Sequence, residues 1–254
     1  MEIQFENKGI LYRCDLSKGI DLSISYKEEF NQVNCFYAPF FSSQAVKQGT
    51  FIGSVKDGGP VNYYNTFINI HGGGTHTEGI GHINKQRDSI NSKLKSFFGF
   101  AYLLSVYPTK MENGDRVITS GSMQLLLEEI DIPEYLIVRT LPNTNDKMSS
   151  HYSGTNPPYV SFEAIQCIKE FGIKHLLIDL PSVDREEDGG KLLSHNCFWE
   201  GNRADDCTIT ELIYVPNHIK DGLYLMNLQV ASMEQDAAPS RPVIYNIYEQ
   251  VDSK

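Results

Sequence analysis

The sequence predicts a mixed α/β fold, and two observations carry that prediction. The segment SFEAIQCIKEFG at 161–172 has the apolar spacing of an amphipathic helix, and the short apolar run HLLIDL follows it almost at once. Several other stretches are rich in β-branched and aromatic residues and have the length of strands. A helix–strand unit among many strands favours a mixed α/β domain over an all-β one. The chain lacks repeats, low-complexity tracts and linker-like segments, which predicts one continuous domain over residues 1–254.

The first third of the chain has the character of strands and turns. GIDLSISY at 19–26 alternates loosely between apolar and polar residues, and YYNTFINI at 63–70 is aromatic and β-branched ahead of a run of glycines. Residues 95–107 (KSFFGFAYLLSVY) are apolar enough to belong to the core. Their periodicity leaves open whether they form a helix or a strand.

Two helices are predicted in the middle of the chain. Ser122 is a candidate N-cap for a helix through MQLLLEEI, which Pro133 would close, and YLIVRT at 135–140 has the composition of a buried strand. Ser161 is a candidate N-cap for the second helix, and Gly172 supplies its end. The apolar side chains on one stripe of that helix are Phe162, Ile165, Ile168 and Phe171.

The remaining segments are predicted to be mostly strands. HLLIDL forms a short strand that Pro181 ends, and REEDGGK forms a solvated loop. ELIYV, LYLMNLQV and PVIYNIYE are predicted as three further strands, and the terminal VDSK as a frayed end.

Composition excludes several classes of partner. The formal charge of −10 argues against nucleic acid or an anionic membrane as the main partner and favours small molecules. No apolar run reaches the ~18–20 residues that a membrane span requires, and the first residues lack a secretory pattern. The five cysteines are widely spaced without a Cys-x-x-Cys pair, which predicts neither a disulfide framework nor a cysteine-rich zinc site and favours a reducing cytoplasm.

The most informative stretch is HGGGTHTEGIGH at 71–82. In an extended strand, His76, Glu78 and His82 share one face with Ile80. Two imidazoles and a carboxylate suit zinc, manganese or ferrous iron. His71 is out of phase, and an extra residue in the glycine run, forming a β-bulge, would return it to the ligand face.

Other interpretations of this stretch fit less well. No Lys-Ser/Thr follows the glycines, as a phosphate loop requires, and the His-Glu-x-x-His spacing of zinc proteases is absent. A glycine-rich turn with solvated or hydrogen-bonded histidines is the plainer alternative. Three histidines with a carboxylate in strand phase favour a metal or catalytic site.

GTHTEGIGH resembles the signature of the cyclase family, which includes bacterial kynurenine formamidase and isatin hydrolase: His-x-Gly-Thr-His-x-Asp-x-Pro-x-His. Gly74, Thr75, His76 and His82 match that signature directly. Glu78 stands in place of its Asp, Ile80 stands in place of its Pro, and His71 lies one residue too far away. Further similarity covers about residues 20–247, in IDLSI, YLIVRT, LLIDLPSVD, LLSH and DAAPSRPV.

The resemblance implies a fold and a set of site residues. The fold is the swivelling β/β/α architecture of that family. His76 and Glu78 would hold a divalent metal together with His71, with zinc favoured and manganese the alternative. His82, His195 and Glu211 would form the other side of the site, as ligands of a second metal or as acid–base groups. His82 and Glu211 are the catalytic candidates.

Other candidate residues depend on weaker signals. Asp179 is a candidate substrate-binding residue because it lies at a predicted strand end, where α/β folds place active sites, and Asp184 is its near neighbour. His151, in a predicted loop, is a candidate substrate contact. The residues that we interpret as structural or unreactive are Ser182, His175, His218, Cys197 and Cys207.

The predicted activity is metal-dependent hydrolysis of a small amide, formamide or lactam, of the arylformamidase kind found in tryptophan catabolism. Two alternatives stay open: a relative that binds a metal or small ligand without turnover, and an intramolecular cyclase or dehydratase that uses the same site. The resemblance also implies a homodimer or a larger homo-oligomer.

Overall fold

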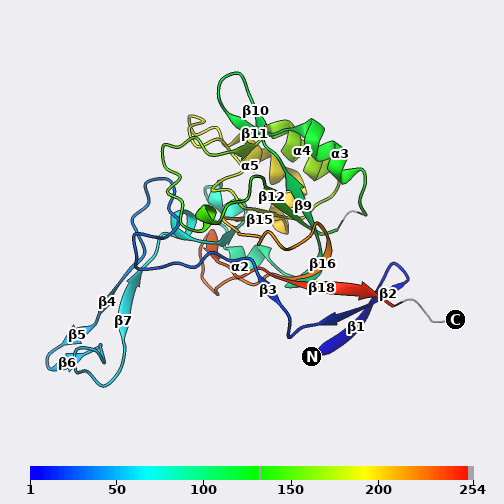
Figure 1. The fold of residues 1–254 in the computed structure, drawn as a ribbon. Helices are drawn as coiled ribbons and strands as arrows, with labels where there is room; N and C mark the ends of the chain where they lie inside the picture. Colours follow the sequence, from blue (N-terminus) through cyan, green and yellow to red (C-terminus); the bar gives the residue numbers. More distant parts are fainter. Residues whose placement is uncertain (132, 251–254) are drawn as a thin grey trace.

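A long mixed sheet runs through the computed structural model, which describes residues 1–131 and 133–250 (Figure 1). Its eleven strands follow the order β1-β2-β18-β16-β9-β12-β14-β15-β8-β17, with β3 paired to β18. The strands are β1 (Glu2–Asn7), β2 (Ile10–Asp15), β3 (Ile20–Asp21), β8 (His76–Glu78), β9 (Phe98–Val106), β12 (Tyr135–Thr140), β14 (His175–Ile178), β15 (Thr208–Glu211), β16 (Gly222–Asn227), β17 (Ala237–Pro239) and β18 (Val243–Glu249). The predicted mixed α/β class is confirmed.

The centre of this sheet is parallel. Strands β9, β12, β14 and β15 run side by side in the same direction, and all six residues of β12 are buried. Such strands are covered on both faces, which explains their continuous apolar sequences. Strand β8 runs antiparallel to β15, with His76 opposite Glu211. The start of β8 therefore lies at the edge where the parallel strands end.

Three helices lie together on one side of the sheet (Figure 1). These are α3 (Ser120–Leu127), α4 (Phe162–Glu170) and α5 (Leu193–Phe198). The larger core cluster lies between them and the sheet, and a second cluster fills the other face. The shorter helical turns are α1 (Ile70–Gly73), α2 (Ile90–Lys93), η1 (Ile80–His82), η2 (Asn145–Met148) and η3 (Gly201–Asp205).

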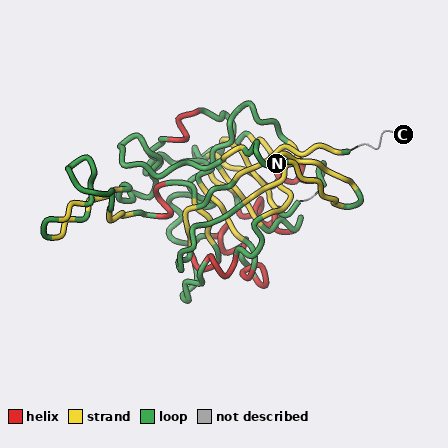
Figure 2. Tube along the Cα trace, turned by 90° about the horizontal axis from the view of Figure 1, so that it is seen from below, coloured by secondary structure: helices red, strands yellow, loops and turns green. Residues whose placement is uncertain are grey.

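An arm formed by residues 42–67 extends away from the body (Figures 1 and 2). It pairs β4 (Ser42–Ala45) with β7 (Tyr64–Phe67), and β5 (Lys47–Gln48) with β6 (Phe51–Ile52) near its tip. The arm exposes large apolar side chains, including those of Tyr63 and Phe67. A further small sheet in the body contains β10 (Thr109–Lys110), β11 (Arg116–Ile118) and β13 (Tyr159–Val160).

The helix predicted after Ser161 is confirmed. The Ser161 side chain accepts a hydrogen bond from the Ala164 amide, 3.1 Å, and thus caps the first turn of α4. Ile165 and Ile168 are buried as the stripe requires and Phe171 is half-buried, but Phe162 is exposed, so its place on the buried stripe was wrong. Gly172 has φ +85°, the left-handed conformation that commonly follows a helix.

The helix predicted after Ser122 begins and ends earlier than expected. Its N-cap is Thr119, whose side chain accepts a hydrogen bond from the Ser122 amide, and the helix stops at Leu127. The predicted N-cap Ser122 was therefore wrong by three residues, and Pro133 lies beyond the actual end. Thr119 has the same type of capping side chain as Ser122, so local sequence did not distinguish them.

Several strand predictions are confirmed and others need correction. The open segment 95–107 is a strand, β9, and YLIVRT and HLLIDL contain β12 and β14. The strand expected in ELIYV is wrong, because Glu211 ends β15 and Leu212 takes φ 54°. Strand structure in GIDLSISY and YYNTFINI is limited to β3, an isolated bridge at Ser23, and β7. The frayed end expected at VDSK lies outside the described residues.

The predicted span of one domain over residues 1–254 also extends past the described residues, and it stays a prediction. Among residues 1–131 and 133–250, the helices are all too short or too polar to cross a bilayer.

Candidate metal centre

The core of the site is formed by two neighbouring strands. His76 and Glu78 alternate along β8 and so project from the same face of the sheet. Because His76 pairs with Glu211 in the register, the Glu211 side chain joins that face, and its Oε2 lies 3.5 Å from His76 Nε2. On the opposite face, Thr77 and Thr210 share a hydrogen bond of 2.8 Å. Strand register thus gathers one imidazole and two carboxylates from distant parts of the chain.

Two buried polar atoms in this group lack a hydrogen-bond partner among the described residues. His76 is fully buried, and its Nδ1 lies 3.0 Å from the Gly74 carbonyl oxygen. If Nδ1–H donates that bond, the Nε2 lone pair faces the site, where it lacks a hydrogen-bond partner among the described residues. Glu78 Oε2 also lacks a hydrogen-bond partner among the described residues, although it lies 3.2 Å from His71 Nδ1. A buried unsatisfied polar atom costs about 1–3 kcal/mol, so both atoms call for a bound partner.

His195 enters the site from α5. Its Nε2 lies 2.9 Å from Glu78 Oε1, and its Nδ1 lies 2.6 Å from Asp184 Oδ2. Asp184 also accepts the backbone amides of Ser194 and His195, so it satisfies the first turn of α5 as well. This carboxylate–imidazole contact fixes the ring and directs Nε2 at the cluster, as in metal sites where a carboxylate orients a ligating histidine.

His71 also reaches the cluster, but not through the predicted β-bulge. The glycine run forms the end of helix α1, whose N-cap Asn69 accepts the Gly72 amide at 2.9 Å. A Cβ at Gly72 would collide with the Ala38 side chain, so the glycine permits close packing rather than a bulge. The helical turn places His71 Nδ1 3.2 Å from Glu78 Oε2.

The prediction that His82 shares a strand face with His76 and Glu78 was also wrong in its mechanism. Strand β8 ends at Glu78, and the 3-10 turn η1 carries His82 back toward it. His82 Nδ1 lies 3.7 Å from Glu78 Oε2. A Cβ at Gly81 would collide with the backbone of Asp88, which explains why this tight turn contains a glycine.

Sequence reasoning missed one residue, Asp236. Its Oδ2 lies 3.1 Å from His71 Nε2 and 3.5 Å from His82 Nδ1. Asp236 opens the segment DAAPSRPV and directly precedes β17, which pairs with β8. The sequence did contain a signal for Asp236, since this acidic residue begins a segment that resembles the family. However, only the pairing of β17 with β8 brings Asp236 close to the histidines.

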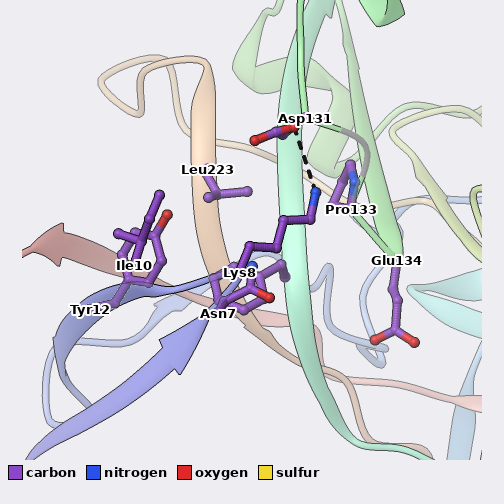
Figure 3. Close-up of a pocket in the computed structure, with 9 residues that line it drawn as sticks. Asn7, Lys8, Ile10, Tyr12, Asp131, Pro133, Glu134 and Leu223 are labelled. Atoms are coloured by element: carbon purple, nitrogen blue, oxygen red, sulfur yellow. Dashed lines mark ion pairs between the residues drawn. The ribbon is translucent and has the colours of Figure 1, made fainter.

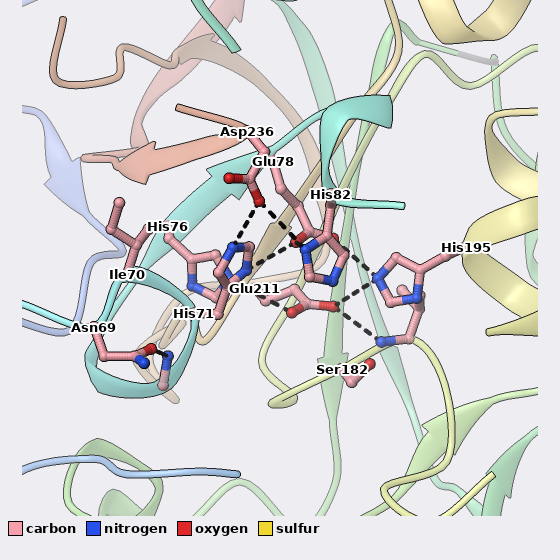
Figure 4. Close-up of polar contacts among 12 residues, drawn as sticks. Asn69, Ile70, His71, His76, Glu78, His82, Ser182, His195, Glu211 and Asp236 are labelled. Carbon is pink, nitrogen blue, oxygen red and sulfur yellow. Dashed lines mark hydrogen bonds and ion pairs between the residues drawn. The ribbon is translucent and has the colours of Figure 1, made fainter. Parts of the chain in front are cut away.

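Figure 4 shows the imidazoles of His71, His82 and His195 converging with the carboxylates of Glu78 and Asp236. Three overlapping groups of potential metal ligands result. They are His71, His82 and Asp236; His71, His76 and Glu78; and Glu78, His82 and His195.

The electrostatics of the cluster are strongly coupled. Burial lowers the pKa of His195, but hydrogen bonds to Asp184 and Glu78 outweigh it and raise that pKa to about 10. Burial also lowers the pKa of His71, but the neighbouring carboxylates of Asp236 and Glu78 outweigh it and raise that pKa to about 10. Burial raises the pKa of Glu78, yet the facing imidazoles hold it well below its usual range. The buried carboxylates are therefore stabilised by nearby positive charge. Either protons on the histidines or a bound metal cation supplies that charge.

The cluster opens into a cavity of about 240 Å³. His71, His82, His195 and Glu211 line one side, and Phe36 and Leu192 contribute apolar wall. A similar cavity of about 230 Å³ lies beside the β1–β2 hairpin (Figure 3). Its walls are mainly apolar, with an ion pair between Lys8 and Asp131 at 3.6 Å. The first cavity therefore combines space with convergent ligand atoms, which marks it as the candidate site.

The two predicted substrate contacts have partners of their own. Asp179 accepts hydrogen bonds from Thr140 and from Lys147 Nζ, the latter at 2.7 Å. His151 packs against Phe30 and Phe40, and its ring nitrogen Nε2 lies 3.0 Å from the Phe30 carbonyl oxygen. A role in substrate binding stays a prediction for both.

The residues interpreted as structural lie as follows. His175 is buried, stacks on Tyr135 and contacts Thr208, while His218 is exposed. Cys197 and Cys207 are buried members of the main core, and all five cysteines are free thiols. The Ser182 hydroxyl accepts the Asp184 amide at 3.1 Å and so shapes the turn below the site.

The donor set fits a divalent cation. Neutral imidazoles and carboxylates are ligands of zinc and manganese, and here they include two buried atoms without hydrogen-bond partners among the described residues. His76 and His195 each anchor one ring nitrogen on an acceptor and turn the other inward, as second-shell orientation requires.

Comparison with known proteins agrees with this geometry. The family model for cyclases matches residues 20–185. This chain belongs to the cyclase family. No curated protein matches the chain.

Solved structures of the family share its fold. One is described as a potential metal-dependent hydrolase with cyclase activity; it is 16% identical with a TM-score of 0.62, and the match covers 90% of this chain and 98% of the other. A predicted metal-dependent hydrolase from Bacillus stearothermophilus is 18% identical over the same shares, also with a TM-score of 0.62. Isatin hydrolase A from Ralstonia solanacearum is 13% identical with a TM-score of 0.64, over 90% and 91% of the two chains. The swivelling β/β/α architecture expected from the sequence is thereby confirmed.

Proposed function

We propose that this cyclase-family protein is a metal-dependent hydrolase of a small amide, formamide or lactam. The observation that carries the proposal is the pair of orphaned buried atoms, His76 Nε2 and Glu78 Oε2, in a ligand cluster beside an open cavity. Core polar groups that served only stability would satisfy one another. The likeness to isatin hydrolases, which act on a small cyclic amide, supports the substrate class.

His71, His76 and Glu78 would hold the cation, because one potential ligand atom of each lies within 4.8 Å of the others. Two of these residues also contribute the buried atoms without hydrogen-bond partners, His76 Nε2 and Glu78 Oε2. We favour zinc, with manganese as the alternative, since mixed imidazole and carboxylate ligands suit both ions. When bound, such a cation polarises a carbonyl oxygen and lowers the pKa of water toward ~7.

Glu211 is the residue best placed to move the proton. Its Oε1 accepts the Val183 amide at 3.0 Å, which fixes the carboxylate, while Oε2 lies beside His76. Glu211 also lines the cavity, so a water or a substrate nitrogen would reach it. It would take a proton from the attacking water and return it to the leaving nitrogen. His82, the other candidate, turns its Nδ1 toward Glu78 and Asp236.

The test is hydrolysis of N-formylkynurenine, isatin and simple lactams by protein stripped with a chelator and reloaded with zinc or manganese. We expect turnover only in the reloaded protein, with a product heavier than the substrate by one water when a ring is opened. His76→Ala should abolish turnover, whereas His218→Ala, a matched change at an exposed histidine, should leave it intact. A loaded protein inert to all these substrates would contradict the proposal, and a product that has lost water would indicate a cyclase or dehydratase.

We also propose a homo-oligomer in which the arm packs on a second copy of the chain. The arm carries Lys47, Lys56 and Asp57, a net charge of +1, so the rest of the chain carries −10 − 1 = −11. A slightly basic arm with exposed aromatic residues complements an acidic body. Light scattering after gel filtration should show a dimer or larger species, and replacing Tyr63 and Phe67 with Asp should yield a monomer.

The free thiols fit a reducing cytoplasm, which we propose as the location.

A further inference from the structure

A further cavity, which we call the strand-end cavity, lies where two central parallel strands end. Its volume is about 380 Å³, compared with about 240 Å³ for the cavity at the metal centre, and the two have no lining residue in common. Its lining includes Thr140, the last residue of β12, and Tyr107, which directly follows β9. The carboxyl ends of parallel strands commonly bind ligands in α/β proteins, so this cavity deserves its own explanation.

Much of the wall of the strand-end cavity is apolar. Leu141, Pro142, Pro157 and Pro158 line it, together with Leu180. The prolines have no backbone N–H and a fixed φ, so they give a rigid wall that offers no backbone donor. A ligand would therefore place an apolar body here, and a few polar side chains would recognise the rest of it.

Lys147 lines the strand-end cavity, but its hydrogens are already used. Its Nζ donates to Asp179 Oδ2 at 2.7 Å, to the Thr140 carbonyl oxygen at 2.7 Å and to the Thr140 hydroxyl at 2.8 Å. An ammonium group has three hydrogens, so these contacts leave none for a ligand. The pair of Lys147 and Asp179 carries no net charge, so the buried carboxylate of Asp179 does not make the wall negative.

Arg116, at the start of β11, is the other cation that lines the strand-end cavity. Its Nη2 donates to the Asn156 carbonyl oxygen at 3.3 Å, and within the described part of the chain it has no acidic partner. The other arginines either form an ion pair or lie over an aromatic ring; they are Arg87, Arg139, Arg185 and Arg241, and Arg13 and Arg203.

This lack of an acidic partner is notable because 32 acidic residues outnumber 22 basic ones in the chain. The residues that line the strand-end cavity include neither Asp nor Glu. A guanidinium group presents paired N–H donors that match the two oxygens of a carboxylate. Arg116 therefore remains available to an anion from outside the chain.

We propose that the strand-end cavity binds a small organic carboxylate. Arg116 would hold the carboxylate, and the wall of leucines and prolines would hold the apolar body. Thr144 also lines the cavity, and because its side chain does not cap the turn η2, its hydroxyl is a further donor for the ligand. The site needs no metal and does not rest on the hydrolase function proposed above.

The segment 150–155 borders both this cavity and the metal centre. Tyr152 lines the strand-end cavity, whereas the Gly154 amide donates at 2.7 Å to Oε1 of Glu186, which lines the cavity at the metal centre. The two sites therefore lie on different sides of one segment. Substitutions in one cavity can be tested without touching the lining of the other.

The test is titration calorimetry of the full chain with benzoate and hexanoate, and with their neutral counterparts benzamide and hexanamide. We expect each carboxylate to bind at least ~10-fold more tightly than its amide, because only the carboxylate forms a charge-assisted pair with Arg116. Acetate, which lacks an apolar body, should bind more weakly than either carboxylate.

Arg116→Gln should weaken the binding of benzoate by at least ~10-fold and leave that of benzamide unchanged. Arg116→Lys, which keeps the charge but loses the paired donors, should lie between the two. The matched control is Arg13→Gln, a change at an exposed arginine over the Tyr248 ring, which should bind benzoate normally. Circular dichroism confirms that each variant is folded.

A crystal structure with benzoate locates the ligand, and we expect its carboxylate against the Arg116 guanidinium. Benzoate found only at the metal centre, or bound equally well by Arg116→Gln, would overturn the proposal. So would the absence of binding by both carboxylates. Tighter binding of inorganic phosphate than of benzoate would also contradict it, since the site would then select a phosphate rather than a carboxylate with an apolar body.

Discussion

Two buried carboxylates, Glu78 and Asp179, have opposite surroundings. Glu78 ends β8 and Asp179 directly follows β14, and both are almost completely buried. Asp179 accepts the Thr140 amide and hydroxyl at 2.9 Å each, and Lys147 Nζ at 2.7 Å. Glu78 instead faces imidazoles, and its Oε2 lacks a hydrogen-bond partner among the described residues.

The contrast shows how the partners of a buried acid indicate its role. Amide, hydroxyl and ammonium groups can only donate hydrogens to Asp179, so its contacts tie the end of β12 to the end of β14. Imidazoles can give up a proton and present a lone pair, so the partners of Glu78 can become its fellow metal ligands. Burial raises the pKa of Asp179, whereas the imidazoles hold that of Glu78 well below its usual range.

The largest expected effect comes from Glu78→Gln. The change keeps the shape but removes the charge and one ligand oxygen, so bound metal should fall and turnover should drop by more than ~100-fold, the upper range for groups that only orient a ligand. Metal content and kcat/KM of the folded protein measure this. Glu78→Asp keeps the charge but has a side chain shorter by one methylene. Its metal content and kcat/KM should lie between those of the unmodified protein and those of Glu78→Gln. Full metal content in Glu78→Gln would show that Glu78 is not a metal ligand, and Glu78 would then not differ from Asp179 in its role.

Asp179→Asn should instead destabilise the fold without removing metal. Breaking a buried ion pair leaves Lys147 without its counter-charge, at a cost of about 3–5 kcal/mol. Urea unfolding measures the loss, and Asp179→Asn combined with Lys147→Met should recover part of it. Metal content and KM of the folded fraction should stay unchanged. A raised KM at normal stability would favour the substrate contact predicted from the sequence.

The smallest expected effect is a change in stability with pH that comes from His175. This histidine and His195 are both buried, but like Asp179 and Glu78 they have different surroundings. Burial lowers the pKa of His175 to about 4, whereas the carboxylates around His195 raise its pKa to about 10. A histidine with a depressed pKa binds fewer protons when folded than when unfolded, so its neutral form stabilises the fold above pH ~6.5 and this is lost as pH falls toward 4. The loss amounts to about 3 kcal/mol at most.

Unfolding free energies at pH 7 and pH 5 check this prediction. The unmodified protein should lose more stability between these values than His175→Gln, which cannot titrate. An equal loss in both proteins would show that His175 has an ordinary pKa and is no contrast to His195.

The sequence by itself determined the elements whose signals are local. The apolar spacing after Ser161 predicted α4, and continuous apolar runs predicted β12 and β14, because helix caps and strand composition act over a few residues. It also identified His71, His76, Glu78 and His82 as a group, since the stretch 71–82 concentrates ligand side chains. The likeness to the cyclase family added His195 and Glu211.

Tertiary structure alone decided how these residues meet. A helical turn rather than a bulge carries His71 inward, a 3-10 turn carries His82, and the pairing of β17 with β8 adds Asp236. Each outcome depends on packing against distant segments, such as Ala38 against Gly72 and Asp88 against Gly81. Local periodicity cannot predict those tertiary contacts. The stretch HGGGTHTEGIGH therefore specified which residues are candidate ligands, and the rest of the fold specified their geometry.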